Sequence, residues 1–271
     1  DLARNAPPAF PNLVSFGIAR LPDLSEGARF TITDNEIRFE GRARSSDVYE
    51  ALMALTRQPA PGGARVTMAI RPPVASPFDW SAVVEPETVT LTGAVPSEDV
   101  RRELVAAAGT ALAGRTLRDE QRVADGAPQD FGIAARVALE HAQKLARGRI
   151  NLTDRTFNVD GQSAGPEAYD ALKRATMQST LPQGFRVGRF SVNAPTIAPY
   201  TWSLTKSGGD VRITGFMPNE TVKRELVAQA SLVPGWKVSE DLQVGDGAPD
   251  RFLETVRLML GQALRLETGS I

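Results

Sequence analysis

The residues best placed for chemistry form a glycine-serine-glycine stretch, Gly161-Gln162-Ser163-Ala164-Gly165. The spacing G-x-S-x-G between an expected strand and an expected helix is that of a nucleophile elbow, in which a serine attacks a carbonyl carbon. A serine of this kind needs a histidine base that follows it in the chain. The one histidine, His141, precedes it. We therefore interpret this stretch as a structural bend, and catalysis by Ser163 is the disfavoured alternative.

Few residues in the sequence are candidates for binding a metal ion. With one histidine and no cysteine, zinc or copper sites of the usual composition cannot be assembled. His141 is interpreted as a partly exposed helical residue in preference to a ligand or base. Two acidic turns, Asp125-Gly126 and Gly245-Asp246-Gly247, have Asp130 or Asp250 nearby and suggest calcium. They lack the dense alternating oxygen ligands of a calcium loop, so turns preceding a helix are favoured. We predict no catalytic, cofactor-binding or metal-binding residue and no cofactor.

Two further sets of residues suit a lipid surface. The first is aromatic and consists of Phe78, Trp80, Tyr200, Trp202 and Trp236. These side chains can form a rim for lipid, but their recurrence at strand starts favours packing in the core or between units. The second set is basic and consists of Arg101, Arg102, Lys223 and Arg224. These residues can meet anionic headgroups, but the acidic residues beside them favour a solvated helix surface.

The amino-acid composition limits the classes of protein to which the chain can belong. The chain has 271 residues, of which 42% are hydrophobic and 23% are charged, as in soluble globular proteins. Its 31 Lys and Arg nearly balance its 32 Asp and Glu, which excludes the basic surface of a nucleic-acid-binding protein. No apolar run is long enough to span a bilayer. The chain starts at Asp1 without a signal sequence, so we expect a piece processed or cut from something longer.

The sequence contains an internal repeat, which indicates how the fold positions these residues. Residues 89–108 read VTLTGAVPSEDVRRELVAAA and residues 211–230 read VRITGFMPNETVKRELVAQA, with 12 of 20 positions identical. An internal repeat of this kind is the strongest guide to architecture. Units of about 50 residues bury too little apolar surface to be stable alone, so we expect neighbouring units to pack on one another.

The hydrophobic patterns predict an α+β fold of four strand-strand-helix-strand units in two pseudo-repeats of about 121 residues. Alternate units carry an additional leading helix. The expected divisions are residues 1–76 for unit 1 with its leading helix, 77–125 for unit 2, 126–198 for unit 3 with its leading helix, 199–247 for unit 4, and 248–271 for the leading helix of a truncated further unit.

Several local features are specific enough to compare with a structure. Leading helices are predicted over 10–24 and 131–146, and Asp34-Asn35 is predicted to close a hairpin. Ser45 or Ser46, Ser97 and Asn219 are expected as helix N-caps. The four units share a glycine just after the second strand, where we expect a bend or a close backbone approach. These glycines are Gly41, Gly93, Gly161 and Gly215.

This pattern resembles the BON domain, a bacterial module. The matching stretches are VTLTGAVPSEDVRRELVAAA with RTLRDEQRV, and VRITGFMPNETVKRELVAQA with WKVSEDLQV. FEGRARSSDVYEAL and VDGQSAGPEAYDAL fit more loosely. The long repeat also looks like the region that precedes the peptidoglycan-binding domain of large OmpA-family envelope proteins. That domain is not in this sequence.

The resemblance implies a non-catalytic periplasmic module of an OmpA-like protein, associated with the outer membrane or cell wall of a Gram-negative bacterium. Its implied partners are anionic phospholipid surfaces or envelope proteins, with peptidoglycan bound only through a domain outside this chain. The family has no established catalytic residues to transfer to this sequence. The alternative is a ring- or filament-building module that packs on other copies. An enzyme is the third and least favoured class. The ligand, the oligomeric state and the orientation of the units stay open.

Overall fold

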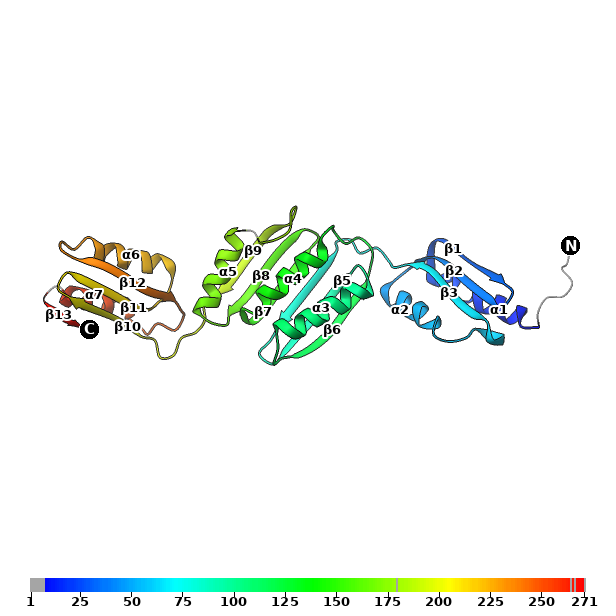
Figure 1. Ribbon diagram of the computed structural model, residues 1–271, viewed down its shortest axis with the longest axis horizontal. Coiled ribbons are helices and arrows are strands. Elements are labelled where there is room, and N and C mark those ends of the chain that lie inside the picture. The colour runs from blue at the N-terminus through cyan, green and yellow to red at the C-terminus, as the bar shows by residue number, and fades with distance from the viewer. Residues whose placement is uncertain (1–7, 179, 264, 266, 271) are drawn as a thin grey trace.

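The computed structural model describes residues 8–178, 180–263, 265 and 267–270, and the units it contains lie end to end (Figure 1). It is a mixed α+β structure with seven α-helices and three sheets in these residues, which confirms the α+β part of the predicted fold class. The sequence pattern also predicts a helix over 166–179 and a helical position for Leu264, and Ser179 and Leu264 lie outside the described residues. The order strand-strand-helix-strand occurs four times, and its three-stranded core is always an antiparallel hairpin followed by a parallel third strand.

The N-terminal part is a three-stranded sheet with two helices. Its elements are α1 (Phe10–Ile18), β1 (Leu24–Thr33), β2 (Glu36–Ala43), α2 (Ser46–Leu55) and β3 (Arg65–Arg71). The strand order is β1-β2-β3. Alternate residues of β2, Ile37 and Phe39, are fully buried against Leu13 of α1 and Leu52 of α2. The period-2 burial of the strand therefore positions both helices on one face of the sheet.

The central part is one continuous six-stranded sheet. Its elements are β4 (Asp79–Val84), β5 (Thr88–Val95), α3 (Glu98–Ala111), β6 (Thr116–Val123), α4 (Phe131–Ala142), β7 (Leu145–Thr153), β8 (Thr156–Ser163), α5 (Pro166–Gln178) and β9 (Arg186–Asn193). The order is β6-β5-β4-β7-β8-β9, with β4 and β7 antiparallel over six residue pairs. Residues of 77–125 and 126–198 thus share one sheet and one hydrophobic core.

The C-terminal part has the same hairpin and parallel strand. Its elements are β10 (Trp202–Ser207), β11 (Asp210–Met217), α6 (Glu220–Ser231), β12 (Lys237–Val244), α7 (Phe252–Ala263) and β13 (Thr268–Ser270). The strand order is β12-β11-β10-β13, and β13 is antiparallel to β10. Leu204, Ile213 and Val256 are buried in its core.

The predicted ends of both leading helices were wrong, and the end of the chain contains a strand that was not predicted. The helix expected over 10–24 ends at Ile18, and Pro22 lies in a separate 3₁₀ turn because proline lacks the N–H that a continuing helix needs. The helix expected over 131–146 ends at Ala142, since Leu145 is fully buried as the first residue of β7. The short strand β13 was not predicted at all.

The predicted turn and caps are confirmed. Asp34 adopts φ 51° between the paired residues Thr33 and Glu36. Ser45 accepts a hydrogen bond from the N–H of Val48 at 3.2 Å. Ser97 and Asn219 cap α3 and α6 in the same way. Each cap satisfies an N–H that the first helical turn leaves unpaired.

The four shared glycines lie where two backbones approach closely. All have positive φ, from 96° at Gly93 to 148° at Gly161. A Cβ on Gly41 would lie 3.2 Å from the Cα of Ala28, and one on Gly93 or Gly161 would overlap the carbonyl oxygen of the neighbouring strand. The expected close backbone approach is confirmed, and it explains why all four units use glycine here.

One buried hydrogen bond distinguishes the central part from the C-terminal part. Trp80 Nε1 donates to Oε1 of the fully buried Gln121 at 2.8 Å. At the matching place in the C-terminal sheet stands Leu242, and the buried Nε1 of Trp202 has no partner among the described residues. An unpaired buried donor costs about 1–3 kcal/mol.

We therefore expect Gln121→Leu to lower the free energy of unfolding by about 2 kcal/mol, because it leaves Trp80 Nε1 unpaired. Leu242→Gln should not destabilise comparably, since it offers Trp202 an acceptor. Urea unfolding followed by tryptophan fluorescence measures both changes. Equal losses in the two variants would contradict this account.

The N-terminal and central parts are joined by polar contacts. Arg42 of β2, with a side chain only 12% exposed, donates to the Asp125 carboxylate at 2.5 Å and to the carbonyl of Pro72 at 2.6 Å. Asp125 also exchanges backbone hydrogen bonds with the linker at Pro73 and Ala75. At the next junction Asp246 makes the matching backbone bonds with Pro195 and Ile197. Both linkers are therefore held by the residue that follows a third strand.

Candidate functional site

The candidate site is the part of the central sheet's uncovered face that β7, β8 and β9 form. On β7, β8 and β9, buried apolar residues alternate with exposed or half-buried polar residues. Because strand side chains alternate between faces, the polar set lies opposite helices α3, α4 and α5 (Figure 1). We call this set the arginine face: Arg147, Arg149, Asn151, Thr156, Asn158, Asp160, Gln162, Arg186, Arg189, Ser191 and Asn193. Four arginines there face one aspartate.

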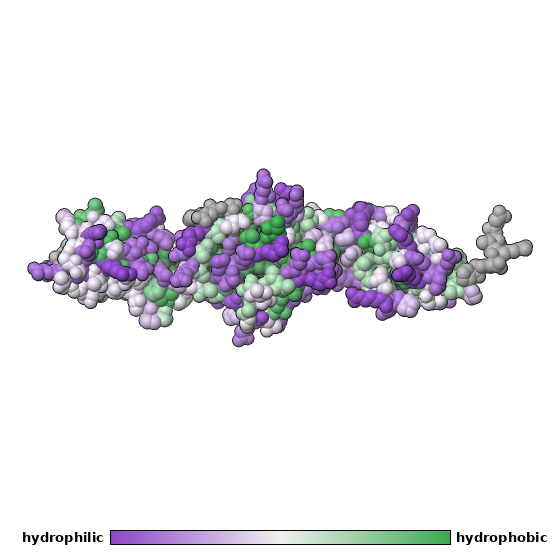
Figure 2. Space-filling model, in the orientation of Figure 1, coloured by the Kyte–Doolittle hydropathy of each residue, from purple (hydrophilic) through white to green (hydrophobic). Residues whose placement is uncertain are grey.

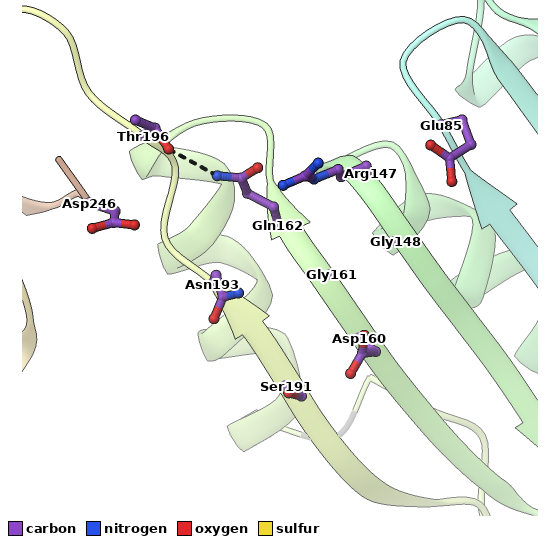
Figure 3. Close-up of a pocket in the computed structure, with 10 residues that line it drawn as sticks. All are labelled: Glu85, Arg147, Gly148, Asp160, Gly161, Gln162, Ser191, Asn193, Thr196 and Asp246. Carbon is purple, nitrogen blue, oxygen red and sulfur yellow. Dashed lines mark hydrogen bonds between the residues drawn. The ribbon is translucent and has the colours of Figure 1, made fainter.

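A hollow of about 480 Å³ opens at the end of this face beside the second linker (Figure 3). Gln162 of β8 donates to Thr196 Oγ1 at 3.2 Å across it. Arg147 of β7 lies on one side, and the Asp246 carboxylate lies on the other (Figure 3). Glu85 and Asp160 also line the hollow, so this end of the face is mildly acidic.

A second hollow, of about 420 Å³, lies further along the same strands. It is lined by Arg149, Asn151, Asn158, Asp160 and Arg189 among others. Arg189 Nη2 is 2.8 Å from the Asp160 carboxylate, and its backbone N–H donates to Asn158 Oδ1 at 2.8 Å. Among the described residues, Arg147 and Arg149 have no carboxylate within 4.0 Å.

This arrangement suits an oxygen-rich anionic ligand. Guanidinium groups form charge-assisted hydrogen bonds to phosphate, and amide and hydroxyl side chains donate to the remaining oxygens. Arginines that lack a protein carboxylate are available for such bonds. The two hollows described on this surface are open to solvent, so it fits an extended surface of headgroups better than a single small molecule.

The sequence prediction missed the arginine face. The signal was present as a period-2 polar pattern, Arg147-x-Arg149-x-Asn151-x-Thr153, which indicates a strand with one solvated face. The sequence repeat pointed instead to the basic residues on the helices, because these recur at equivalent positions. Arg149 has a counterpart in Arg29 of the N-terminal part, but neither arginine of β7 lies in the strongly repeated stretches 89–108 and 211–230.

The predicted bend at Gly161 is confirmed, and Ser163 is not placed as a nucleophile. Ser163 is 1% exposed, and its Oγ donates to the carbonyl of Asn193 at 3.2 Å. His141 does not approach it, since its Nε2 pairs with Thr180 Oγ1 at 3.2 Å. The first glycine of the G-x-S-x-G stretch is therefore explained by the close approach of β7 and β8 at Gly161.

His141 differs from the expectation of a partly exposed residue, because it is only 7% exposed at the end of α4. Its ring packs edge-on against Phe157 with centroids 5.7 Å apart. Burial, with a smaller effect of the Lys144 charge, lowers the pKa of His141 to about 4. Its counterpart in α7 is Gln262, so the position tolerates a neutral side chain.

This histidine predicts a pH dependence of stability. Its pKa is about 4 in the folded protein and about 6.5 in the unfolded chain, so the unfolded state binds the proton more tightly. His141 should have no effect above pH 6.5 and should destabilise the fold increasingly as the pH falls from 6.5 to 4, by about 3 kcal/mol. Urea unfolding at several pH values should show this loss in the wild type and not in His141→Gln. Parallel curves for the two proteins would refute it.

The two acidic turns belong to the linkers. Asp125 pairs with Arg42, and Asp246 holds the second linker through its backbone. Asp130 has positive φ just before α4. Among the described residues, no group of three or more acidic or histidine side chains could hold a metal ion.

Of the aromatic set, Phe78 and Trp80 are buried, and Tyr200, Trp202 and Trp236 are half-buried. Phe78 and Trp80 are 1% and 0% exposed and pack edge-on against Phe131. Tyr200 packs against Phe252 with centroids 5.0 Å apart, and burial, with the nearby Asp246, raises the pKa of Tyr200 to about 12. The preference for core and inter-unit packing is confirmed for these residues.

The basic helical residues are engaged within the fold. Arg101 pairs with Asp119 at 2.7 Å and Arg102 pairs with Asp99. Lys223 pairs with Glu240 at 3.3 Å, and Arg224 donates to the carbonyl of Glu220. Figure 2 shows hydrophilic side chains over much of the viewed surface, with apolar surface in separate patches. The interpretation of these residues as a solvated helix surface is favoured over a lipid site.

Comparison with known protein families gives a match for one segment of the chain. Residues 70–124 match the BON domain. The match covers β4, β5, α3 and β6, one half of the six-stranded sheet. BON domains occur in bacterial envelope proteins, are associated with phospholipid binding and are non-catalytic, which is consistent with an interaction role. No curated protein matches the chain. Among the described residues, no helix is long and apolar enough to cross a membrane.

Proposed function

We propose that this chain is a non-catalytic module that binds anionic phospholipid surfaces through the arginine face. The observation that carries the proposal is that β7, β8 and β9 present four arginines and one aspartate on one open side, with Arg147 and Arg149 more than 4.0 Å from any carboxylate in the described part of the chain. A single arginine near an anionic membrane contributes about 1 kcal/mol. Several on one flat face therefore suffice for reversible binding.

The wider assignment rests on the repeated strand order. The element order that matches the BON domain in residues 70–124 also occurs in residues 24–71, 145–193 and 202–244. This supports four BON-like units, with the divisions 1–76, 77–125, 126–198 and 199–247, followed by 248–271 as the leading helix of a further unit. From the same resemblance we propose that the chain is part of an OmpA-like protein and lies in the periplasm, beside the outer membrane.

Co-sedimentation with vesicles tests the lipid proposal. The chain should pellet with vesicles that contain phosphatidylglycerol and stay in solution with pure phosphatidylcholine. Salt should weaken the binding, because charges on an exposed face are screened over about 10 Å at 0.1 M ionic strength. Absence of binding to anionic vesicles at low salt would remove the lipid role.

A further inference from the structure

The hollow beside the second linker corresponds to a place at the first linker that an arginine fills. There Arg42, near the end of β2, donates to the Asp125 carboxylate at 2.5 Å and to the carbonyl of Pro72 at 2.6 Å. Asp125 lies just after β6, and 39% of its side chain is exposed. The first junction therefore shows that a guanidinium group suits a carboxylate and a linker carbonyl in this position.

The second junction repeats both acceptors. Asp246 has the position of Asp125, since each exchanges the same pair of backbone hydrogen bonds with its linker. Pro195 and Pro73 accept the equivalent bond in the two linkers, so the residue before Pro195, Ala194, stands at the position of Pro72. The carboxylate and the linker carbonyl thus recur beside the end of β8.

The second junction lacks the cation. Gln162 stands where Arg42 stands, because each pairs with the last residue of the third strand of its unit. Its side chain donates to Thr196 at 3.2 Å, and Arg147 lies on the far side of it from Asp246 (Figure 3). Asp246 is exposed, and none of the described lysines and arginines places a nitrogen within 4.0 Å of its carboxylate.

The lining of the hollow has an excess of negative charge. Asp246, Asp160 and Glu85 contribute carboxylates, and Arg147 is the one cation among the described residues that line it. Amide and hydroxyl side chains beside them offer further oxygen acceptors. The hollow has a volume of about 480 Å³ and opens to solvent, so a cationic side chain or a small cation can enter it.

We propose that this hollow binds a guanidinium group supplied by another molecule. The Asp246 carboxylate and the Ala194 carbonyl take the roles that Asp125 and Pro72 have around Arg42. A planar guanidinium presents five N–H donors in a fixed fork, so it can bond a carboxylate and a carbonyl at once. When bound, it ties the end of β12 to the second linker, as Arg42 ties β2 to the end of β6.

This inference does not rest on lipid binding. Arg147 lines the hollow as a like charge, so Arg147→Gln should strengthen the binding of a guanidinium. The same substitution removes one arginine from the surface that we propose for vesicles and should weaken binding there. The two proposals therefore predict opposite effects of one substitution, and failure of either can be recognised separately.

NMR titration of the ¹⁵N-labelled chain with N-acetylarginine amide tests the proposal. The Gly247 N–H donates to Asp246 Oδ1 at 2.8 Å, so its signal reports on this carboxylate. The signals of Gly247 and of the Gln162 side-chain amide should shift to saturation. N-acetylcitrulline amide, which has nearly the same shape without the charge, should cause no saturable shift. Absence of a saturable shift with the arginine compound, or equal shifts with both compounds, would overturn the proposal.

Two variants test the position of the site. Gln162→Arg supplies the guanidinium from the chain itself and should abolish the shift of Gly247, whereas Gln143→Arg adds the same charge at an exposed position outside the hollow and should not. Asp246→Asn should weaken binding by about tenfold or more, because a bond to a charged partner is lost. Its control is Asp210→Asn, also at an exposed position. Equal affinities within either pair of variants would overturn the proposal.

The source of the guanidinium is distinguished by comparing ligands. We expect the peptide acetyl-Gly-Arg-Gly-amide to bind more tightly than free L-arginine, because the α-carboxylate of the free amino acid is repelled by an acidic hollow. This order indicates an arginine of a partner protein, and the reverse order indicates a small molecule with the same group. Both orders support a guanidinium site, and binding of neither ligand would overturn it.

Discussion

Gly161→Ala should lower the free energy of unfolding of the central part by about 3 kcal/mol. Two effects combine. Gly161 has φ 148°, a conformation that costs a non-glycine residue of order 1–3 kcal/mol. Its new Cβ would also overlap the carbonyl oxygen of Arg147 and the Cα of Gly148, and backbone atoms of a paired strand cannot move aside at low cost. Urea unfolding monitored by circular dichroism measures the loss.

Two neighbouring variants separate this effect from other causes. Gly165→Ala adds the same methyl group four residues further on, where nothing lies within 4 Å, and should change stability little. Ser163→Ala removes one hydrogen bond to Asn193 and should cost about 1 kcal/mol. A Gly161→Ala protein as stable as Gly165→Ala would contradict the close approach of β7 and β8. Hydrolase activity lost in Ser163→Ala would restore the nucleophile.

The double variant Arg147→Gln/Arg149→Gln should weaken binding to anionic vesicles by about 30-fold. Each arginine contributes about 1 kcal/mol near such a surface, and about 1.4 kcal/mol is a factor of ten in affinity. Both side chains are exposed, so glutamine should leave the fold intact. Co-sedimentation at several lipid concentrations gives the ratio of affinities, and salt should reduce the difference between variant and wild type.

The matched control removes the same charge from the helices. Arg102→Gln/Arg224→Gln lowers the net charge equally, but both residues lie on exposed helix surfaces and contact acidic or backbone partners of their own helix. Its affinity for the vesicles should stay within about twofold of the wild type, since screened charges on the far face contribute little. Equal losses in the two double variants would show that net charge alone governs binding.

Local structure could be predicted because its causes are local. Ser97 and Asn219 cap helices through their own side chains, and Asp34 accepts the left-handed backbone of a tight turn. Gly161 was predicted as a bend because its sister units share the glycine. These features depend on residues a few positions apart, so a single sequence contains the information for them.

Pairing between units could not be predicted in the same way. Nothing local in Trp80 or Leu152 indicates that β4 and β7 pair and merge two units into one sheet. The strand β13 was missed because Thr268-Gly269-Ser270 has little strand propensity, and its pairing with β10 holds it. His141 was expected on the surface because burial at the end of α4 depends on Phe157 from a later strand.

The arginine face was missed for a related reason. Arg147 and Arg149 become one surface with Arg186 and Arg189 only after β7, β8 and β9 form a sheet. The sequence separates the two pairs of arginines by a hairpin and a helix. Side chains that meet through sheet formation are visible to sequence analysis only when the strand order is known.

The central claim is that the arginine face is the surface that meets the membrane. Because the chain has no cysteine, single-cysteine variants can carry a polarity-sensitive fluorophore at Ser191 on this face or at Ala106 on α3, both exposed. On addition of anionic vesicles, the fluorophore in Ser191→Cys should shift to the blue and that in Ala106→Cys should not. A blue shift at Ala106 with none at Ser191 would contradict the account.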